Sequence, residues 1–238
     1  MYNVLFLTDR GLRHQESALR AAPLELNVTM LRAPTFAEAA SALSAAHFII
    51  SERNQPVTAE MIAAAPHLKL IVRLGSLAYD IDREAAAARG ISVVVQPVIG
   101  TLYCAEHALM MTLACLKRLG RSLHAAIHTP APFSPQRSDE DTFSFNWLNF
   151  SDIGSLLGKT VSIVGMGEIG VELTRLLKPF RVGAILYNKR TPYPAAVEAD
   201  LGAQFATLED CLRRADVLIS LLPYAPTTDY ALGGGLTA

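Results

Sequence analysis

The amino-acid sequence predicts an α/β fold made of two units, each a doubly wound parallel sheet covered by helices. Short apolar runs alternate with alanine-rich helical segments over residues 4–96, and the same alternation starts again at Lys159. The expected strands are apolar on both faces, which is typical of parallel strands buried between helices. With 238 residues, 51% of them hydrophobic, the chain has material for one large or two modest cores.

The N-terminal block is expected to alternate strictly between strand and helix. Thr35 stands before an alanine-rich run with Glu38 three residues later, the spacing of a capping box, and Thr58 is a similar candidate cap. Strands are expected at residues 4–7, 27–31, 48–51, 68–74 and 91–96, and helices at residues 12–22, 36–45, 59–65 and 83–89.

The C-terminal block begins with one long helix, expected over residues 101–123, followed by an irregular stretch over residues 124–150 that we expect to be a surface loop. Strands are then expected at residues 160–164, 184–187, 204–206 and 217–222, and helices at residues 169–180, 195–201 and 208–215.

A glycine motif follows the first strand of this second block and leads into a helix. Its residues are Gly165, Gly167, Glu168, Ile169 and Gly170. In a dinucleotide-binding turn one glycine makes the tight turn, one lets the backbone approach pyrophosphate, and one lets helix and strand pack closely. The helix N-terminus then supplies N–H groups and partial positive charge to the phosphates. The alternative is a tight glycine turn that binds no ligand.

The residues expected to choose the cofactor end the next strand: Asn188, Lys189 and Arg190. NAD-selective sites place a carboxylate there against the ribose hydroxyls. An amide followed by two cations instead suits a 2′-phosphate, which Arg190 can bind bidentately. We therefore expect NADP to be preferred, with NAD also possible. The alternative is that Lys189 and Arg190 are ordinary solvated charges.

Composition argues against several classes of partner. The formal net charge of −1 gives no field that would gather nucleic acid or a membrane surface. The three cysteines, Cys104, Cys115 and Cys211, lack metal-ligand spacing and are expected to be buried, reduced thiols. No run is expected to approach the apolar length of a membrane helix, since even residues 105–116 contain Glu106 and His107. No signal peptide is evident, so a cytoplasmic location is expected.

Several segments, taken in order, resemble the D-isomer-specific 2-hydroxyacid dehydrogenase family. They are residues 73–86, 90–97, 105–108, 156–170 and 216–223, with Thr228 after them. The resemblance implies a flavodoxin-like substrate-side domain at residues 1–100 and a Rossmann NAD(P)-binding domain at residues 101–238 that lacks its last strands. It also implies a homodimer, and a small 2-oxo or 2-hydroxy acid as substrate.

The resemblance assigns further site residues. In the family, backbone N–H groups after the glycine hold the substrate carboxylate, which points here to Gly75, Ser76 and Leu77. Arg73 is the one cation expected near substrate, or else it pairs with an acid. On the nicotinamide ribose side the resemblance implies Leu222, Pro223 and Thr228. The chain departs from the family at Leu77, Val95 and Ile99, where the family often has glycine, asparagine and glycine.

The family's catalytic arginine, acidic residue and histidine belong to a segment that this sequence does not match, so no catalytic residue is assigned. His124 and His128 are expected on the surface, and Trp147 is expected to pack at a domain junction. We expect an NAD(P)-dependent 2-hydroxyacid oxidoreductase, C-terminally truncated and of doubtful activity by itself. The alternative is a non-catalytic dinucleotide-binding module or an inactive remnant.

Overall fold

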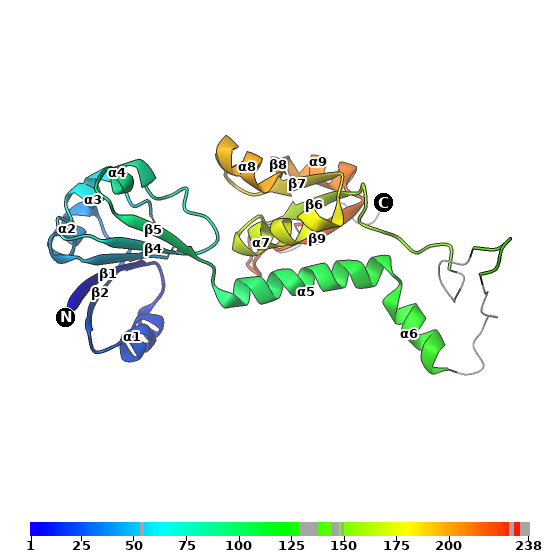
Figure 1. The fold of residues 1–238 in the computed structure, drawn as a ribbon, viewed down its shortest axis with the longest axis horizontal. Helices are drawn as coiled ribbons and strands as arrows, with labels where there is room; N and C mark the ends of the chain where they lie inside the picture. Colours follow the sequence, from blue (N-terminus) through cyan, green and yellow to red (C-terminus); the bar gives the residue numbers. More distant parts are fainter. Residues whose placement is uncertain (53–54, 129–137, 144–147, 149, 229–230, 234–238) are drawn as a thin grey trace. The chain divides into compact units, whose positions relative to one another are not determined.

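The computed structural model describes every residue except 53–54, 129–137, 144–147, 149, 229–230 and 234–238 (Figure 1). It divides the chain into two compact units, Met1–Thr101 and Leu102–Ala238. Each unit contains its own parallel sheet, so the predicted fold class, two doubly wound α/β units, is confirmed.

The first unit holds a five-stranded sheet in the order β2-β1-β3-β4-β5, with all neighbours parallel. This is the flavodoxin-like strand order. Its strands are β1 (Tyr2–Thr8), β2 (Leu26–Arg32), β3 (Phe48–Ser51), β4 (Leu70–Leu74) and β5 (Ser92–Gln96). Its helices are α1 (Leu12–Ala21), α2 (Phe36–Ala45), α3 (Ala59–Ala63) and α4 (Arg83–Ala88).

One large core cluster of the first unit lies on one face of this sheet, while Val4 and Phe6 of β1 are buried on the other. Figure 1 shows α1 on one face and α2, α3 and α4 on the other. Leu5, Leu7, Ile49 and Ile71 from the strands pack with Leu43 and other buried residues of α2, α3 and α4. Apolar side chains that alternate along a strand point to opposite faces, so these residues all face the three helices.

The predicted helix caps are present. The Thr35 N–H donates to Glu38 Oε2 at 2.7 Å, and Thr35 Oγ1 accepts from the Glu38 N–H at 3.3 Å, which completes the capping box. Thr58 Oγ1 accepts from the Met61 N–H at 3.3 Å. Both hydroxyls satisfy first-turn N–H groups that a helix leaves without an internal acceptor.

The single long helix expected over residues 101–123 was wrong. The structure has α5 (Ile99–Leu116) and α6 (Leu119–Ile127), separated at Arg118, whose backbone is left-handed with φ 52°. The segment after the irregular stretch fixes this break: the Gly154 N–H donates to the Leu116 carbonyl at 2.8 Å, and Arg118 pairs with Asp152 at 3.1 Å. The Leu116 carbonyl, which the end of a helix leaves without an internal donor, is thereby satisfied.

The loop expected over residues 124–150 was also wrong at its start, because α6 continues to Ile127. His124 and His128 are exposed, as expected, and their rings stack with centroids 4.1 Å apart. Trp147 lies outside the described residues.

By length and composition, α5 qualifies as a helix that could cross a membrane, with a mean hydropathy of 1.3 over 18 residues. The expectation that no segment approaches this limit was therefore wrong. One such helix is weak evidence for a membrane span, because core helices of soluble proteins meet the same criterion.

The second unit holds a parallel sheet whose described strands lie in the order β8-β7-β6-β9, the first four positions of the Rossmann order. Its strands are β6 (Thr160–Val164), β7 (Ala184–Asn188), β8 (Gln204–Phe205) and β9 (Val217–Ser220). Its helices, apart from α5 and α6, are α7 (Glu168–Leu177), the 3₁₀ turn η1 (Lys178–Phe180), α8 (Ala195–Leu201) and α9 (Leu208–Arg214).

Side-chain chemistry ties these strands together at their amino ends. Asp216, just before β9, accepts from the Thr160 N–H at 2.8 Å and from Lys159 Nζ at 2.9 Å. Both donors lower the pKa of the Asp216 carboxyl, and the hydrogen bond from the Thr160 backbone N–H makes the larger contribution.

The cysteines differ from one another. Cys211 of α9 is buried against Val164 and Leu186, and this burial raises the pKa of its thiol. Cys104 and Cys115 of α5 are exposed, so the expectation of buried thiols was wrong for these two.

Candidate functional site

The glycine turn between β6 and α7 is held by backbone hydrogen bonds. Val164 and Asn188 are register partners at the ends of β6 and β7. The Asn188 carbonyl accepts from the N–H groups of both Gly165 and Met166, each at 3.0 Å. The Gly167 N–H then donates to the Gly165 carbonyl at 2.8 Å. The turn is therefore stabilised by hydrogen bonds within the protein and needs no ligand to form.

Two of the three glycines lie in close contacts that an added Cβ would disturb, with backbone at Gly165 and with side chains at Gly170. Gly165 has φ +90°, and a Cβ there would lie 2.8 Å from the carbonyl carbon of Leu221 and from the nitrogen of Leu222. A Cβ on Gly170 would lie 2.7 Å from Met166 Sδ and 3.4 Å from Ile163 Cγ2. These contacts match the tight-turn and the helix–strand packing roles predicted for the first and third glycines.

Gly167 is different because its free side faces open space. The nearest heavy atom to a Cβ placed there is the Gly165 carbonyl oxygen at 4.0 Å. Its backbone is extended, with φ −106°, a conformation that other residues adopt without strain. Nothing in the described protein needs a glycine at this position, whereas close approach of a ligand to the backbone does.

The first turn of α7 faces this open space with unsatisfied donors. Gly167 is the N-cap and has no side chain to accept from the first turn. The N–H groups of Ile169 and Gly170 have no acceptor within the helix, and the helix dipole adds partial positive charge at the same end. Such an end is an anion site, and the arrangement fits the pyrophosphate of a dinucleotide.

The three residues predicted to choose the cofactor have different surroundings. Asn188 Nδ2 donates to the Ala206 carbonyl at 3.0 Å. Lys189 Nζ lies 3.5 Å from the centroid of the Tyr193 ring, a cation–π contact. Arg190 is exposed, and no described residue forms an ion pair or side-chain hydrogen bond with it. Arg190 is thus the member of the trio whose guanidinium is available to a ligand.

Tyr193 links this region to the glycine turn. Its hydroxyl donates to the Met166 carbonyl at 3.3 Å, and its N–H donates to the Tyr187 hydroxyl at 2.8 Å. The Tyr193 ring, which makes the cation–π contact with Lys189, is therefore hydrogen-bonded to the glycine turn.

The predicted contacts after β9 fall into two groups. Leu222 lies directly against Gly165, close to the phosphate turn. Thr228 Oγ1 donates to the carbonyls of Pro223 (2.5 Å) and Ala225 (3.0 Å), and accepts from the Ala225 N–H at 3.1 Å. The Thr228 hydroxyl thus closes a local turn, and its contact with a nucleotide stays a prediction, like that of Leu222 and Pro223.

A pocket of about 890 Å³ opens between α5 and β9, and it is lined in part by Tyr103, Met111, Ile169, Leu218 and Leu222. Cys104 and Cys115 also line it, which accounts for their exposure. β9 is the edge of the described sheet, so the pocket follows from the open side of that strand.

In the first unit, the predicted carboxylate loop follows β4. Gly75 has φ 150°, and its N–H already donates to the Gln96 carbonyl at 2.8 Å, which leaves the following N–H groups to be considered for a ligand. Ser76 and Leu77 are buried. Their predicted contact with a substrate carboxylate stays a prediction.

Arg73 forms the ion pair that was the alternative to a substrate role. Its guanidinium is 1% exposed, and its Nη2 lies 2.8 Å from Asp80 Oδ2. Its Nε donates to both Asp80 oxygens at 2.9 and 3.0 Å, and its Nη1 donates to the Leu74 carbonyl at 2.5 Å. This buried charge is neutralised by Asp80, and a substrate contact of Arg73 stays a prediction.

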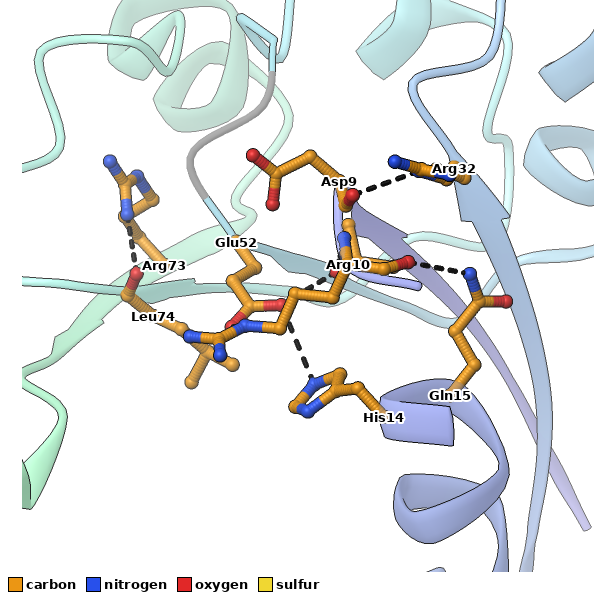
Figure 2. Close-up of polar contacts among 9 residues, drawn as sticks. Asp9, Arg10, His14, Gln15, Arg32, Glu52, Arg73 and Leu74 are labelled. Atoms are coloured by element: carbon orange, nitrogen blue, oxygen red, sulfur yellow. Dashed lines mark hydrogen bonds and ion pairs between the residues drawn. The ribbon is translucent and has the colours of Figure 1, made fainter. Parts of the chain in front are cut away.

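Sequence reasoning missed a second polar cluster at this edge of the sheet. Figure 2 shows Arg10 and His14 directed toward Glu52, with Arg32 and Gln15 bonded to neighbouring backbone. Each residue lies just beyond a strand, Glu52 after β3 and Arg10 after β1, but the sequence does not show that these two strands are neighbours. Parallel strands bring such residues to a common edge.

Among the described residues, no group of histidine, cysteine and carboxylate side chains could hold a metal ion.

The glycine turn, its open face and the strand order together define a dinucleotide-binding α/β unit. Residues 134–234 match the family model described as D-isomer specific 2-hydroxyacid dehydrogenase, NAD binding domain. This match confirms the predicted family resemblance for residues 134–234, and the cofactor class of that domain is a nicotinamide dinucleotide.

The chain is also similar to individual proteins. The chain is 31% identical over 215 residues to D-3-phosphoglycerate dehydrogenase of Mycobacterium leprae, across 90% of this chain and 37% of the relative. It is 33% identical over 190 residues to glyoxylate reductase of Thermococcus kodakarensis, across 77% of this chain and 52% of the relative. The solved PH0520 protein from Pyrococcus horikoshii OT3 aligns with 98% of this chain and 65% of its own, at 25% identity and a TM-score of 0.47. The chain thus spans about half or less of these curated relatives.

Proposed function

We propose that this chain carries the cofactor-binding and substrate-side parts of an oxidoreductase that transfers hydride between NADP(H) and a small 2-oxo or 2-hydroxy acid. The observation that carries the proposal is the open face of Gly167 beside the uncapped N-terminus of α7. The printed names of the relatives, a phosphoglycerate dehydrogenase and a glyoxylate reductase, support the substrate class. A homodimer in the cytoplasm is the assembly and location we propose with it.

Each region would have a distinct task. The N–H groups of Ile169 and Gly170 bind and orient the pyrophosphate, and the bound nicotinamide supplies or accepts the hydride. Backbone N–H groups after Gly75 hold the substrate carboxylate. We assign the proton-transfer step to none of the described residues, because no histidine is among the predicted substrate contacts Arg73, Gly75, Ser76 and Leu77.

NADP preference rests on Arg190. A 2′-phosphate gains charge-assisted hydrogen bonds from an arginine whose fork is not otherwise engaged, and Arg190 meets this condition. Asn188 and Lys189 already have partners in Ala206 and Tyr193, so their part is to shape the site without repelling the phosphate. NAD remains the alternative cofactor.

The test compares the dissociation constants of NADPH and NADH by calorimetry. Arg190→Ala should weaken NADPH binding about tenfold or more and leave NADH binding unchanged, as expected for loss of a charge-assisted pair. Arg214→Ala, at another exposed arginine near the end of α9, is the matched control and should change neither constant. Equal loss for both nucleotides, or no loss, would make the NADP assignment wrong.

Turnover is tested by following NADPH oxidation with glyoxylate and with hydroxypyruvate. Turnover would mean that another residue or subunit supplies the proton. If a folded chain binds nucleotide but gives no turnover, the non-catalytic dinucleotide-binding module becomes the better description.

A further inference from the structure

The carboxyl edge of the first sheet contains a topological switch point between β1 and β3. In the order β2-β1-β3-β4-β5, the chain leaves β1 toward β2 on one side, while β3, β4 and β5 follow on the other. Ligands of doubly wound sheets bind in the crevice that this reversal opens at the carboxyl ends of the strands. The residues just after β1 and β3 are therefore placed to contact a ligand.

Glu52 organises these residues. It follows β3, its side chain is 11% exposed, and its Oε2 accepts from the hydroxyl of the buried Thr8 at 2.7 Å. Its Oε1 accepts from Arg10 Nε at 2.6 Å, and His14 Nε2 lies 3.7 Å from Oε2 (Figure 2). The carboxylate is thus anchored on the β1 side and holds the arginine by its Nε.

The bond to Glu52 places the Arg10 guanidinium near the end of β3, although Arg10 itself follows β1. Because Nε is bonded to Glu52, the guanidinium lies beside the residue that follows β3 rather than beyond the end of β1. Ser51 and Arg73 are register partners, so the next residues along, Glu52 and Leu74, are neighbours across β3 and β4. Glu52, which holds the arginine, therefore follows the strand next to β4, and β4 leads into the Gly75 loop.

Among the described residues, Arg10 is one of the exposed cations at this edge. Its side chain is 53% exposed, and among the described residues its Nη1 and Nη2 form no ion pair or hydrogen bond. Arg73, one strand further on, is buried and neutralised by Asp80. The Gln15 side chain donates to the Arg10 carbonyl at 2.9 Å and fixes the backbone from which the arginine extends.

We propose that Arg10 binds a second anionic group of the substrate, a carboxylate or a phosphate, at the end opposite the carboxylate held after Gly75. Arg10 is then the residue that selects dianionic over monoanionic 2-hydroxy and 2-oxo acids. The inference rests on the proposed function, because it takes the loop after Gly75 as the site of the first carboxylate.

The geometry suits that task. With Nε held by Glu52, the two terminal amino groups form a fork that matches two oxygens of one anion. Preorganisation by Glu52 and Gln15 reduces the conformational entropy lost when the anion binds. Because β3 and β4 are neighbours, the two anionic groups would be those of a short molecule, such as a short diacid or a phosphorylated three-carbon acid.

The test measures acid binding by calorimetry to the full chain saturated with NADPH. The probes are D-lactate with one anionic group, D-malate with a second carboxylate, and 3-phosphoglycerate with a phosphate. At least one of the two acids with a second anionic group should bind about tenfold or more tightly than D-lactate. Which of these two acids gains the affinity identifies the second group as carboxylate or phosphate.

Arg10→Gln should reduce dianion binding to the level of D-lactate while leaving the D-lactate constant unchanged. An unchanged D-lactate constant also shows that the first unit is folded. Arg20→Gln, in the last turn of α1, is the control and should preserve the preference.

Two outcomes would overturn the inference while the proposed function stands: D-lactate and both dianions bind equally to the wild-type chain, or Arg10→Gln weakens all three acids equally. If no acid binds although NADPH does, the substrate part of the proposed function fails and the inference fails with it.

Discussion

The carboxyl edges of the two sheets offer different groups to the anions that we propose they bind. In the first unit the edge carries charged side chains, with Glu52 holding Arg10 and Asp80 holding Arg73. In the second unit the edge consists of glycine backbone at Gly165 and Gly167, and the positive potential comes from a helix end. A side-chain site can discriminate between acids, whereas a backbone site suits the invariant pyrophosphate of a cofactor.

The difference also predicts how substitutions at each edge change stability and binding. A buried ion pair is costly to break, because the charge that stays behind is desolvated and has no partner. At a glycine edge, stability is lost where an added Cβ would clash with neighbouring backbone atoms. Substitutions at the two edges should therefore differ in whether they change stability, binding or both.

The largest effect is expected for Asp80→Asn in the first unit. Arg73 is 1% exposed and would keep its charge without the carboxylate that neutralises it. Removing one partner of a buried pair typically costs about 3–5 kcal/mol, and we expect the free energy of unfolding to fall toward that range, since Asp80 itself is 16% exposed.

Urea unfolding, with hydrogen exchange of the β1–β5 segments as the readout for this unit, measures that loss. Asp152→Asn is the control: its side chain is 46% exposed beside Arg118 and Arg121, and such pairs contribute about 0–1 kcal/mol. Equal effects of the two substitutions would contradict the importance of burial.

The next largest effect is expected for Gly165→Ala in the second unit. The alanine would need φ near +90° and would place its Cβ 2.8 Å from the backbone of Leu221 and Leu222. Strain and overpacking together should lower the free energy of unfolding by about 2–4 kcal/mol.

Gly202→Ala separates the two causes of that loss. Gly202 also has a positive φ, +65°, but a Cβ there meets nothing within 4 Å. It should cost only about 1 kcal/mol in urea unfolding, the conformational term alone. If Gly165→Ala were no worse than Gly202→Ala, the close approach of the segment after β9 would not constrain the turn.

The sequence predicted most of the second edge because its features are local. The glycine spacing, the preceding apolar strand and the following helix lie within one short segment, and the structure assigns separate packing roles to Gly165 and Gly170. The capping box at Thr35 was predictable for the same reason, since its partners are three residues apart.

Features that depend on distant partners were not predictable from the sequence. The left-handed Arg118 that ends α5 is stabilised by Asp152 and Gly154, far along the chain. The pairing of Arg10 with Glu52 joins residues 42 positions apart, and only the parallel register of β1 and β3 brings them together. Periodicity predicts strands, but it does not say which charged residues will meet at their ends.

Gly167→Ala should have the smallest effect on stability and a clear effect on binding. An added Cβ has no neighbour closer than 4.0 Å, and φ −106° is accessible to alanine, so the free energy of unfolding should change by less than about 1 kcal/mol. The same methyl group would occupy the space through which pyrophosphate reaches the N–H groups of α7. Affinity for NADPH should therefore fall about tenfold or more, and affinity for NADH should fall equally, because both cofactors share the pyrophosphate. Calorimetry with both nucleotides, beside urea unfolding of the same sample, separates the two effects.

Normal affinity in a stable Gly167→Ala chain would mean that the phosphates bind elsewhere. A large loss of stability would instead show that the open face of Gly167 is a packing surface, and the contrast between the two edges would then disappear.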